Sequence, residues 1–161
     1  MEGVVDRGVP PDGRRTVRDA LTQYYRERGL LGVDETVDAR LHERWIHMKV
    51  FGRLIPIQPL LGHQGPFLLH DVHHMLTGYG TSYRAELEEA AWEIGSGGCG
   101  RWILFWNSRI LAFLQGLVLC PRRTLRALRA GRRDRNLYRR RAPDVLDSDL
   151  AEIVAFVHPR G

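Results

Sequence analysis

The segment LLHDVHHMLTGYGTSYRAELEEA, residues 68–90, carries the side chains of this chain that are best suited to chemistry. On a helix, His70 and His74 lie four residues apart and project from one face, and Asp71 flanks that face. Two imidazoles and a carboxylate at this spacing can converge on a divalent cation. Zinc takes such ligands at about 2.0–2.2 Å, and iron or manganese accepts them too. The alternative is a polar patch on an ordinary helix, because histidine pairs at this spacing are common.

The turn TGYGT after the histidines predicts a second helix that runs back antiparallel to the first. An acidic side chain of that helix can then complete the cation site, and the candidates are Glu86, Glu88, Glu89 and Glu93. Glu86 needs the least reach, because it follows the turn most closely. His73 lies on the other side of the His70–His74 line from Asp71. We interpret it as a solvated surface residue in preference to a hydrogen-bond donor behind the ligands.

The elements that must position these residues are helices. Apolar residues recur at helical spacing in the first expected helix, 16–29, and further helices are expected at 34–53, 66–77, 83–95 and 147–157. Residues 54–66, rich in proline and glycine, predict a loop or bent connector. No segment alternates as a strand does. The sequence therefore predicts an all-α fold: a compact, single-domain helical bundle of about six helices with a metal site between two consecutive helices.

The composition indicates the number of domains and the cellular compartment. The chain has 161 residues, of which 43% are hydrophobic and 27% are charged, and this composition is typical of one globular domain. We expect a flexible leader at 1–13 and a single helical domain at 14–161. Cys99 and Cys120 form neither a disulfide framework nor a paired metal motif, so a reducing cytoplasm is expected. The polar N-terminal segment predicts neither a secretory signal nor a membrane anchor.

An apolar segment at 102–120 matches the bilayer in length but not in composition. Its nineteen residues are interrupted by Asn107, Arg109 and Gln115. An arginine at mid-membrane costs about 2.5–3.5 kcal/mol on insertion scales, so a buried or membrane-facing helix is expected in place of a spanning one. Its aromatic side chains either form the core or line a groove for a prenyl tail, and they are Trp102, Phe105, Trp106 and Phe113.

The stretch 122–141 holds ten arginines and one acidic residue, Asp134. It can be a solvated helix face, a surface for anionic lipid at about 1 kcal/mol per basic residue, or a nucleic-acid surface. Leu125, Leu128 and Leu137 give it an apolar stripe, and it follows an apolar helix, so the membrane surface is favoured over nucleic acid. No recognition helix or set of stacking aromatics indicates a nucleic-acid partner.

The whole motif, HDVHH followed by eleven residues and Glu86 with LTGYGT between, resembles the signature of the coenzyme Q (ubiquinone) biosynthesis protein 4 family. The similarity continues through EAAWEIGSG and extends more loosely over residues 45–120. The resemblance implies a mostly helical protein, a short prokaryotic-type member, that binds a divalent metal, usually zinc. It implies His70, Asp71, His74 and Glu86 as the metal ligands.

The same resemblance implies a role in ubiquinone biosynthesis. The expected substrate is a polyprenylated aromatic acid, and the expected reaction is decarboxylation of the ring at carbon 1, in some members coupled to hydroxylation. Expected partners are the prenylated quinone precursor, other quinone-biosynthesis proteins and the inner face of the membrane, contacted peripherally from the cytoplasm. The chain is shorter than eukaryotic members and carries His73 inside the motif, and both departures leave the substrate open.

Two other functions compete with a decarboxylase. A non-enzymatic prenyl-lipid-binding scaffold would use the metal structurally. A zinc hydrolase would use HDVHH as a variant of the HExxH helix, with Asp71 as general base and not as ligand. The catalytic residues beyond the metal set, the substrate-binding residues and the oligomeric state are left open by the sequence.

Overall fold

The computed structural model describes residues 14–31, 37, 45–50, 53–59 and 65–159. Within them, seven helices and one hairpin follow in the order α1 (Val17–Glu27), β1 (Trp45–Val50), β2 (Arg53–Pro59), α3 (Gly65–Thr77), α4 (Tyr83–Gly95), α5 (Ile103–Leu119), α6 (Pro121–Gly131), α7 (Ala142–Asp147) and α8 (Leu150–Val157). The predicted all-α bundle is confirmed. The predicted leader, residues 1–13, lies outside the described residues.

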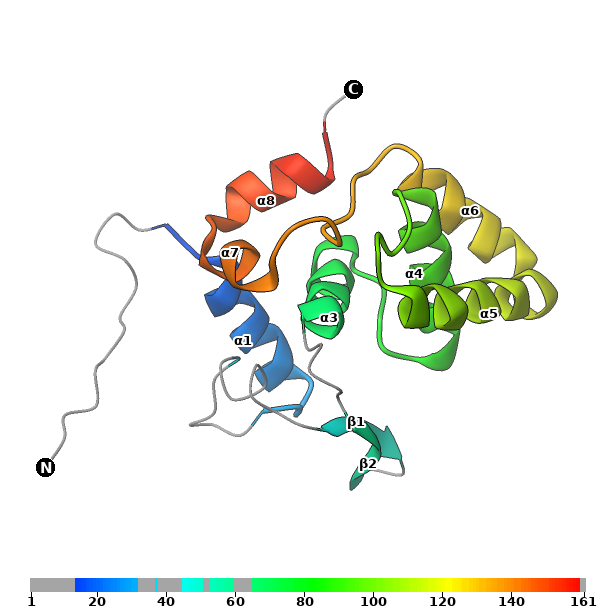
Figure 1. The fold of residues 1–161 in the computed structure, drawn as a ribbon, viewed down its shortest axis with the longest axis horizontal. Helices are drawn as coiled ribbons and strands as arrows, with labels where there is room; N and C mark the ends of the chain where they lie inside the picture. Colours follow the sequence, from blue (N-terminus) through cyan, green and yellow to red (C-terminus); the bar gives the residue numbers. More distant parts are fainter. Residues whose placement is uncertain (1–13, 32–36, 38–44, 51–52, 60–64, 160–161) are drawn as a thin grey trace, which may run out of the picture.

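Helix α3 lies between two groups of helices (Figure 1). On one side, α1, α7 and α8 pack together, and α1 and α7 both contact α3. On the other side, α4 packs against α5 and α6 and also contacts α3. The central helix therefore faces α4 with one surface and α1 with another, and the motif histidines lie on this central helix.

The turn between α3 and α4 follows the predicted chemistry. Gly78 adopts φ +74° just after the last turn of α3, a left-handed conformation that glycine favours. Ser82 then caps α4, since its hydroxyl accepts a hydrogen bond from the Ala85 amide at 3.3 Å. This short connection forces the two helices to be neighbours and fixes the first turn of α4 beside the last turns of α3.

Helices α4 and α6 approach each other so closely that glycine is required on both. A Cβ atom at Gly95 would lie 2.4 Å from the Leu128 carbonyl oxygen, and one at Gly131 would lie 2.2 Å from the Trp92 carbonyl oxygen. Both obstacles are backbone atoms, which no side-chain rotation can move. The close crossing fixes the position of α4, the helix that carries the acidic residues of the site.

The helix predicted at 34–53 is wrong for its second half. Residues 45–50 and 53–59 instead form an antiparallel hairpin with Met48 opposite Ile55 and Val50 opposite Arg53. The loop or bent connector predicted at 54–66 is also wrong in part, because residues 54–59 belong to strand β2. β-branched and aromatic residues in these segments favour strands, and Pro56 is tolerated because a two-stranded sheet has only edge strands. Residues 34–36 and 38–44 lie outside the described part.

The predicted inner faces of the helices form the core. The five apolar residues that predicted α1 are all buried, and they are Val17, Ala20, Leu21, Tyr24 and Tyr25. Four of them, all but Ala20, belong to one core cluster with Leu69 and Val72 of α3 and the C-terminal residues Leu137, Leu146, Ile153 and Val157. The predicted last helix, 147–157, is present as α8, preceded by the short α7.

Helix α5 is apolar on both its inner and outer sides. Phe105 is buried, and Trp102, Trp106 and Phe113 pack against the core, as the core interpretation predicts. The outer side exposes a set of large apolar residues: Ile103, Ile110, Leu111, Leu114, Val118 and Leu119. Among the described residues, no helix is long and apolar enough to cross a membrane. The ten arginines of 122–141 are all exposed, and α6 buries its small residues, Thr124, Ala127 and Gly131.

Candidate metal centre

Three of the four residues implied as ligands converge between α3 and α4. The Nε2 atoms of His70 and His74 lie 3.2 Å apart. The Glu86 carboxylate, in the first turn of α4, places one oxygen 3.1 Å from His74 Nε2 and the other 3.4 Å from His70 Nε2. His70 and His74 are buried, and the Glu86 side chain is 35% exposed, so the group opens toward solvent on the Glu86 side.

These separations match those between ligands of one metal ion. With bonds of about 2.0–2.1 Å and tetrahedral angles, neighbouring ligand atoms lie about 3.3 Å apart. The distance of 3.2 Å between the two imidazole nitrogens is close to this value, and each oxygen of Glu86 lies at a similar distance from one imidazole, 3.1 Å and 3.4 Å. Two imidazole nitrogens and a carboxylate oxygen form a donor set suited to zinc, iron or manganese. The residues present therefore fit a divalent metal at this position.

The far side of each imidazole is held by a hydrogen bond that aims Nε2 at the group. His70 Nδ1 lies 2.8 Å from Glu93 Oε1, and His74 Nδ1 lies 3.2 Å from the Tyr79 carbonyl oxygen. Because carboxylate and carbonyl oxygens accept, both Nδ1 atoms are assigned as donors. Each Nε2 then keeps its lone pair for a cation, the usual arrangement of a metal-binding histidine.

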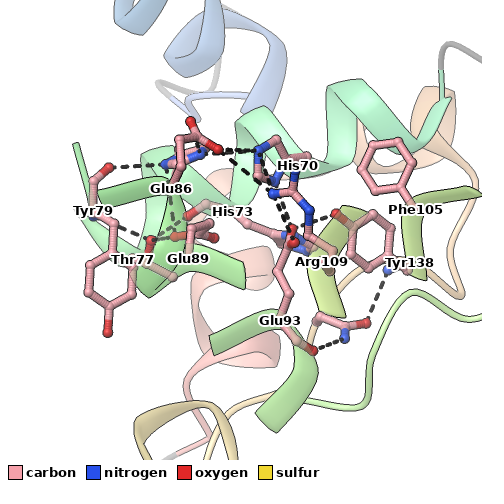
Figure 2. A network of polar contacts seen from close by, with 12 residues as sticks. His70, His73, Thr77, Tyr79, Glu86, Glu89, Glu93, Phe105, Arg109 and Tyr138 are labelled. Carbon is pink, nitrogen blue, oxygen red and sulfur yellow. Dashed lines mark hydrogen bonds and ion pairs between the residues drawn. The ribbon is translucent and has the colours of Figure 1, made fainter. Parts of the chain in front are cut away.

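Glu93 links the centre to the core behind it (Figure 2). Its Oε1 atom accepts from His70 Nδ1, from His73 Nδ1 at 2.9 Å and from the Tyr138 hydroxyl. The Glu93 side chain is fully buried. Burial works to raise its pKa, but the His70 and His73 contacts outweigh this and hold the pKa well below the usual range of a carboxyl. A permanent negative charge therefore sits directly behind the metal-facing imidazole of His70.

The interpretation of His73 as a solvated residue is wrong. His73 is fully buried, and its ring packs against Trp92 and Tyr138. Its Nε2 accepts from the Leu137 amide at 2.9 Å, so its proton resides on Nδ1 and is donated to Glu93. Burial lowers the pKa of His73, which keeps the ring neutral. The helical period placed His73 off the ligand face, but it could not reveal that the chain near residue 137 covers that side.

A second group of potential ligands, His73, Glu89 and Glu93, also lies close together. It does not offer a free imidazole nitrogen, since one nitrogen of His73 accepts from the Leu137 amide and the other donates to Glu93. Glu89 instead accepts from the Thr77 hydroxyl at 2.8 Å and is fully buried. Burial raises the pKa of Glu89 to about 7. We therefore assign one metal position, and treat the second group as its support.

The electrostatics of the ligand group favour positive charge at its centre. Burial tends to lower the pKa of His70, but Glu93 and Glu86 outweigh this effect and raise it to about 10. The pKa of His74 is also raised, because its contact with Glu86 outweighs its burial. The pKa of Glu86 is lowered by its hydrogen bonds to the two imidazoles, despite burial. In the absence of metal, protons supply the positive charge that a cation must replace.

Arg109 borders the open side of the ligand group. Its Nη1 atom lies 3.3 Å from His70 Nε2 and 3.7 Å from oxygens of both Glu86 and Glu93. From the sequence, Arg109 was interpreted only as a polar residue that interrupts the apolar segment 102–120. A single arginine in an otherwise apolar helix is the signal that could have found it, because a buried cation requires anionic neighbours. Glu93 was among the four acidic candidates for the cation site, but its position behind His70 was not predicted, and Tyr138 had no comparable signal.

Asp71 does not join the convergent group. It is half-buried, and its Oδ2 atom accepts a hydrogen bond from the Tyr25 hydroxyl of α1. The ligand role implied for Asp71 by the family resemblance stays a prediction, as does its role as a general base. Glu88 is also outside the group, since it pairs with Arg123 of α6 on another side of α4.

Comparison of the chain with protein-family models, with curated proteins and with solved structures finds no match. The case for function consequently depends on the geometry of the site.

Proposed function

We propose that this chain is a metal-dependent protein of ubiquinone biosynthesis that decarboxylates the ring of a polyprenylated aromatic acid at carbon 1. The observation that carries the proposal is the convergence of His70 Nε2, His74 Nε2 and the Glu86 carboxylate at separations of 3.1–3.4 Å. Its assignment to ubiquinone biosynthesis depends on the motif in residues 70–86, which resembles that of the coenzyme Q biosynthesis protein 4 family.

The number of converging ligands favours catalysis over a structural role. Structural zinc sites are closed by four protein ligands, whereas catalytic sites use three and leave a position for water or substrate. Among the described residues three ligands converge, and the Asp71 carboxylate, which accepts a hydrogen bond from Tyr25, is not beside them. A bound divalent metal would act as a Lewis acid that stabilises negative charge as carbon dioxide leaves. Zinc suits the simple reaction, while an oxidative version would require an oxidant such as dioxygen together with a redox-active metal or a bound redox cofactor, because zinc has no redox chemistry.

The protein residues divide the remaining work. Glu93 and the Tyr79 carbonyl orient the two imidazoles, and the buried side of the site excludes water from them. Glu86 and Arg109 bound the open side, where the substrate must enter. Ile110 and Leu111, exposed apolar residues of α5, follow Arg109 in the sequence but lie on other faces of that helix.

Metal content tests the proposal first. We expect about one zinc, iron or manganese ion per chain by elemental analysis of the purified or reconstituted protein. His74→Ala should abolish binding, because it removes one of three ligands. His158→Ala is the matched control, since His158 lies in the C-terminal segment and pairs with Asp134. A folded wild-type protein that takes up no metal would refute the metal centre.

Product formation separates an enzyme from a scaffold, the second candidate, which the exposed apolar side of α5 favours. Glu86→Gln preserves the size of the side chain and weakens the metal site. For an enzyme, release of carbon dioxide from a short-chain 3-prenyl-4-hydroxybenzoate should fall by at least tenfold. For a scaffold, the variant should lose thermal stability while a reconstituted pathway still makes product.

Membrane contact is proposed through α5 and the basic helix that follows it. Val118 is 80% exposed near the end of α5, and Arg122 and Arg123 are exposed at the start of α6. Apolar side chains beside arginines suit the surface of an anionic bilayer. We expect sedimentation with vesicles of phosphatidylglycerol that Val118→Asp weakens by at least tenfold. Val154→Asp, an exposed valine of α8, is the control. If the wild-type protein does not sediment with these vesicles, the proposed membrane contact is refuted.

A further inference from the structure

A metal bound at His70 Nε2 would occupy the atom that lies closest to Arg109 in the site. Among the described residues, its closest contact in the site is Nη1 to His70 Nε2, at 3.3 Å, and that nitrogen is a metal ligand. The oxygens of Glu86 and Glu93 lie at 3.7 Å from Nη1, which is an ion-pair distance and not a hydrogen bond. Within the same part of the chain, its Nε donates weakly to Ser108 Oγ at 3.4 Å, and Nη2 donates to no protein atom. A planar guanidinium is thus left with donors to offer.

The charges around the metal position leave room for one further anion. A divalent cation held by two neutral imidazoles and Glu86 carries one net positive charge, and Arg109 adds a second. Glu93 neutralises one of these. A buried charge is costly unless it is paired, so an anion at the open side, beside Arg109, suits the centre.

We propose that Arg109 is the substrate-binding residue that holds the carboxylate of an aromatic monocarboxylic acid beside the metal. This inference rests on the proposed function, whose metal site it requires. The fork of an arginine matches a carboxylate with two parallel hydrogen bonds. Its side chain is 15% exposed at the open side, so it is reachable from solvent, and α5 holds it there. Binding at Arg109 fixes the acid group against the metal and orients the ring for loss of that group.

Cobalt-substituted protein offers a test that does not depend on turnover. The visible spectrum of bound Co²⁺ changes when a ligand enters beside it. We expect 4-hydroxybenzoate to shift the wild-type spectrum with saturation, and 4-hydroxybenzamide, its neutral analogue, to have no effect. Arg109→Gln should bind the same amount of cobalt and raise the dissociation constant for 4-hydroxybenzoate at least tenfold. Arg109→Lys, which keeps the charge and loses the fork, should fall between the two. Arg129→Gln, on the exposed face of α6, is the control for charge loss.

The possible results test the role of Arg109, the recognition of a carboxylate and the metal centre separately. Unchanged 4-hydroxybenzoate affinity in cobalt-loaded Arg109→Gln would overturn the role of Arg109, as would a wild-type cobalt protein that does not respond to the acid. Equal binding of the amide would overturn recognition of a carboxylate. Tighter binding of phenyl phosphate, weakened by Arg109→Gln, would reassign the subsite to phosphate. Failure of the wild type to take up cobalt or zinc would instead refute the proposed metal centre, and the role of Arg109 with it.

Discussion

Replacement of Glu93 by glutamine tests whether a buried charge behind His70 organises the site. The substitution keeps the shape of the side chain and removes its negative charge. Glu93 Oε1 accepts three hydrogen bonds, from His70, His73 and Tyr138, and its other oxygen lies 3.7 Å from Arg109 Nη1. A glutamine carbonyl can still accept these bonds, but its amide group then faces the Arg109 cation.

The magnitude follows from the difference between charged and neutral acceptors. Hydrogen bonds to charged groups contribute about 1.5–3 kcal/mol and neutral ones about 0.5–1.5 kcal/mol. Three weakened bonds therefore cost about 3 kcal/mol, and the smaller desolvation of an amide offsets part of that. We expect the free energy of unfolding to fall by about 2 kcal/mol in metal-free protein. Loss of an acidic partner behind a metal-binding histidine lowers metal affinity by about 10–100-fold.

Urea denaturation of chelator-treated protein measures the first effect, and competition with a chelating dye measures the second. Glu88→Gln is the matched control, because Glu88 lies on the same helix but pairs with the exposed Arg123. It should leave metal affinity unchanged, because Glu88 lies outside the ligand group and pairs with Arg123. If Glu93→Gln binds zinc within twofold of the wild type, Glu93 does not orient His70, and the reasoning fails.

Three further predictions address the surroundings of the site. His73→Ala should lower the free energy of unfolding by about 3–5 kcal/mol, because it removes a buried ring, leaves the buried Leu137 amide without its partner and removes one of the three hydrogen bonds that Glu93 accepts; urea denaturation of this variant showing a loss below 1 kcal/mol would contradict the network. Gly131→Ala should cost at least about 2 kcal/mol, because its Cβ meets the Trp92 carbonyl oxygen at 2.2 Å, whereas Gly80→Ala, with its nearest contact at 3.9 Å, should be tolerated in the same thermal melts. Because the pKa of His70 is raised to about 10, its proton stabilises metal-free protein fully below pH 6.5, and this stability should be lost as pH rises toward 10, while zinc affinity rises over the same range; stability that is flat with pH in chelator-treated protein would be inconsistent with that pKa.

The local parts of the fold and site could be predicted from the sequence. The helical period identifies α1, α3, α4 and α8, and the glycine-rich turn predicts that α3 and α4 are neighbours. These two facts suffice to bring Glu86 to His70 and His74, because all three lie within one helix–turn–helix unit. The hairpin was missed because its residues 45–53 also fit a helical period, and pairing with residues 53–59 decided the conformation.

The rest of the site could not be predicted because it comes from distant parts of the chain. The partner of His73 is the amide of Leu137, 64 residues away, and Tyr138 is 45 residues from Glu93. A backbone amide has no residue type that a pattern can detect. Arg109 was visible as a lone charge in an apolar segment, but its direction depends on how α5 packs against α4. The hydrogen-bond partner of Asp71 could not be predicted either, because Tyr25 lies on α1, 46 residues earlier in the chain.

The tie between His73 and Leu137 has a consequence for the order of events during synthesis. When residue 95 leaves the ribosome, the nascent chain already contains both histidines and Glu86, the three side chains that would hold a metal ion. Glu93 and His73 become enclosed only after residues 137 and 138 have emerged and docked. A metal ion captured early would thus remain exchangeable until about forty more residues had been translated, roughly 2–8 seconds at common elongation rates. Selection of the metal would then fall to the completed chain, in which Glu93 is enclosed and holds His70 in place.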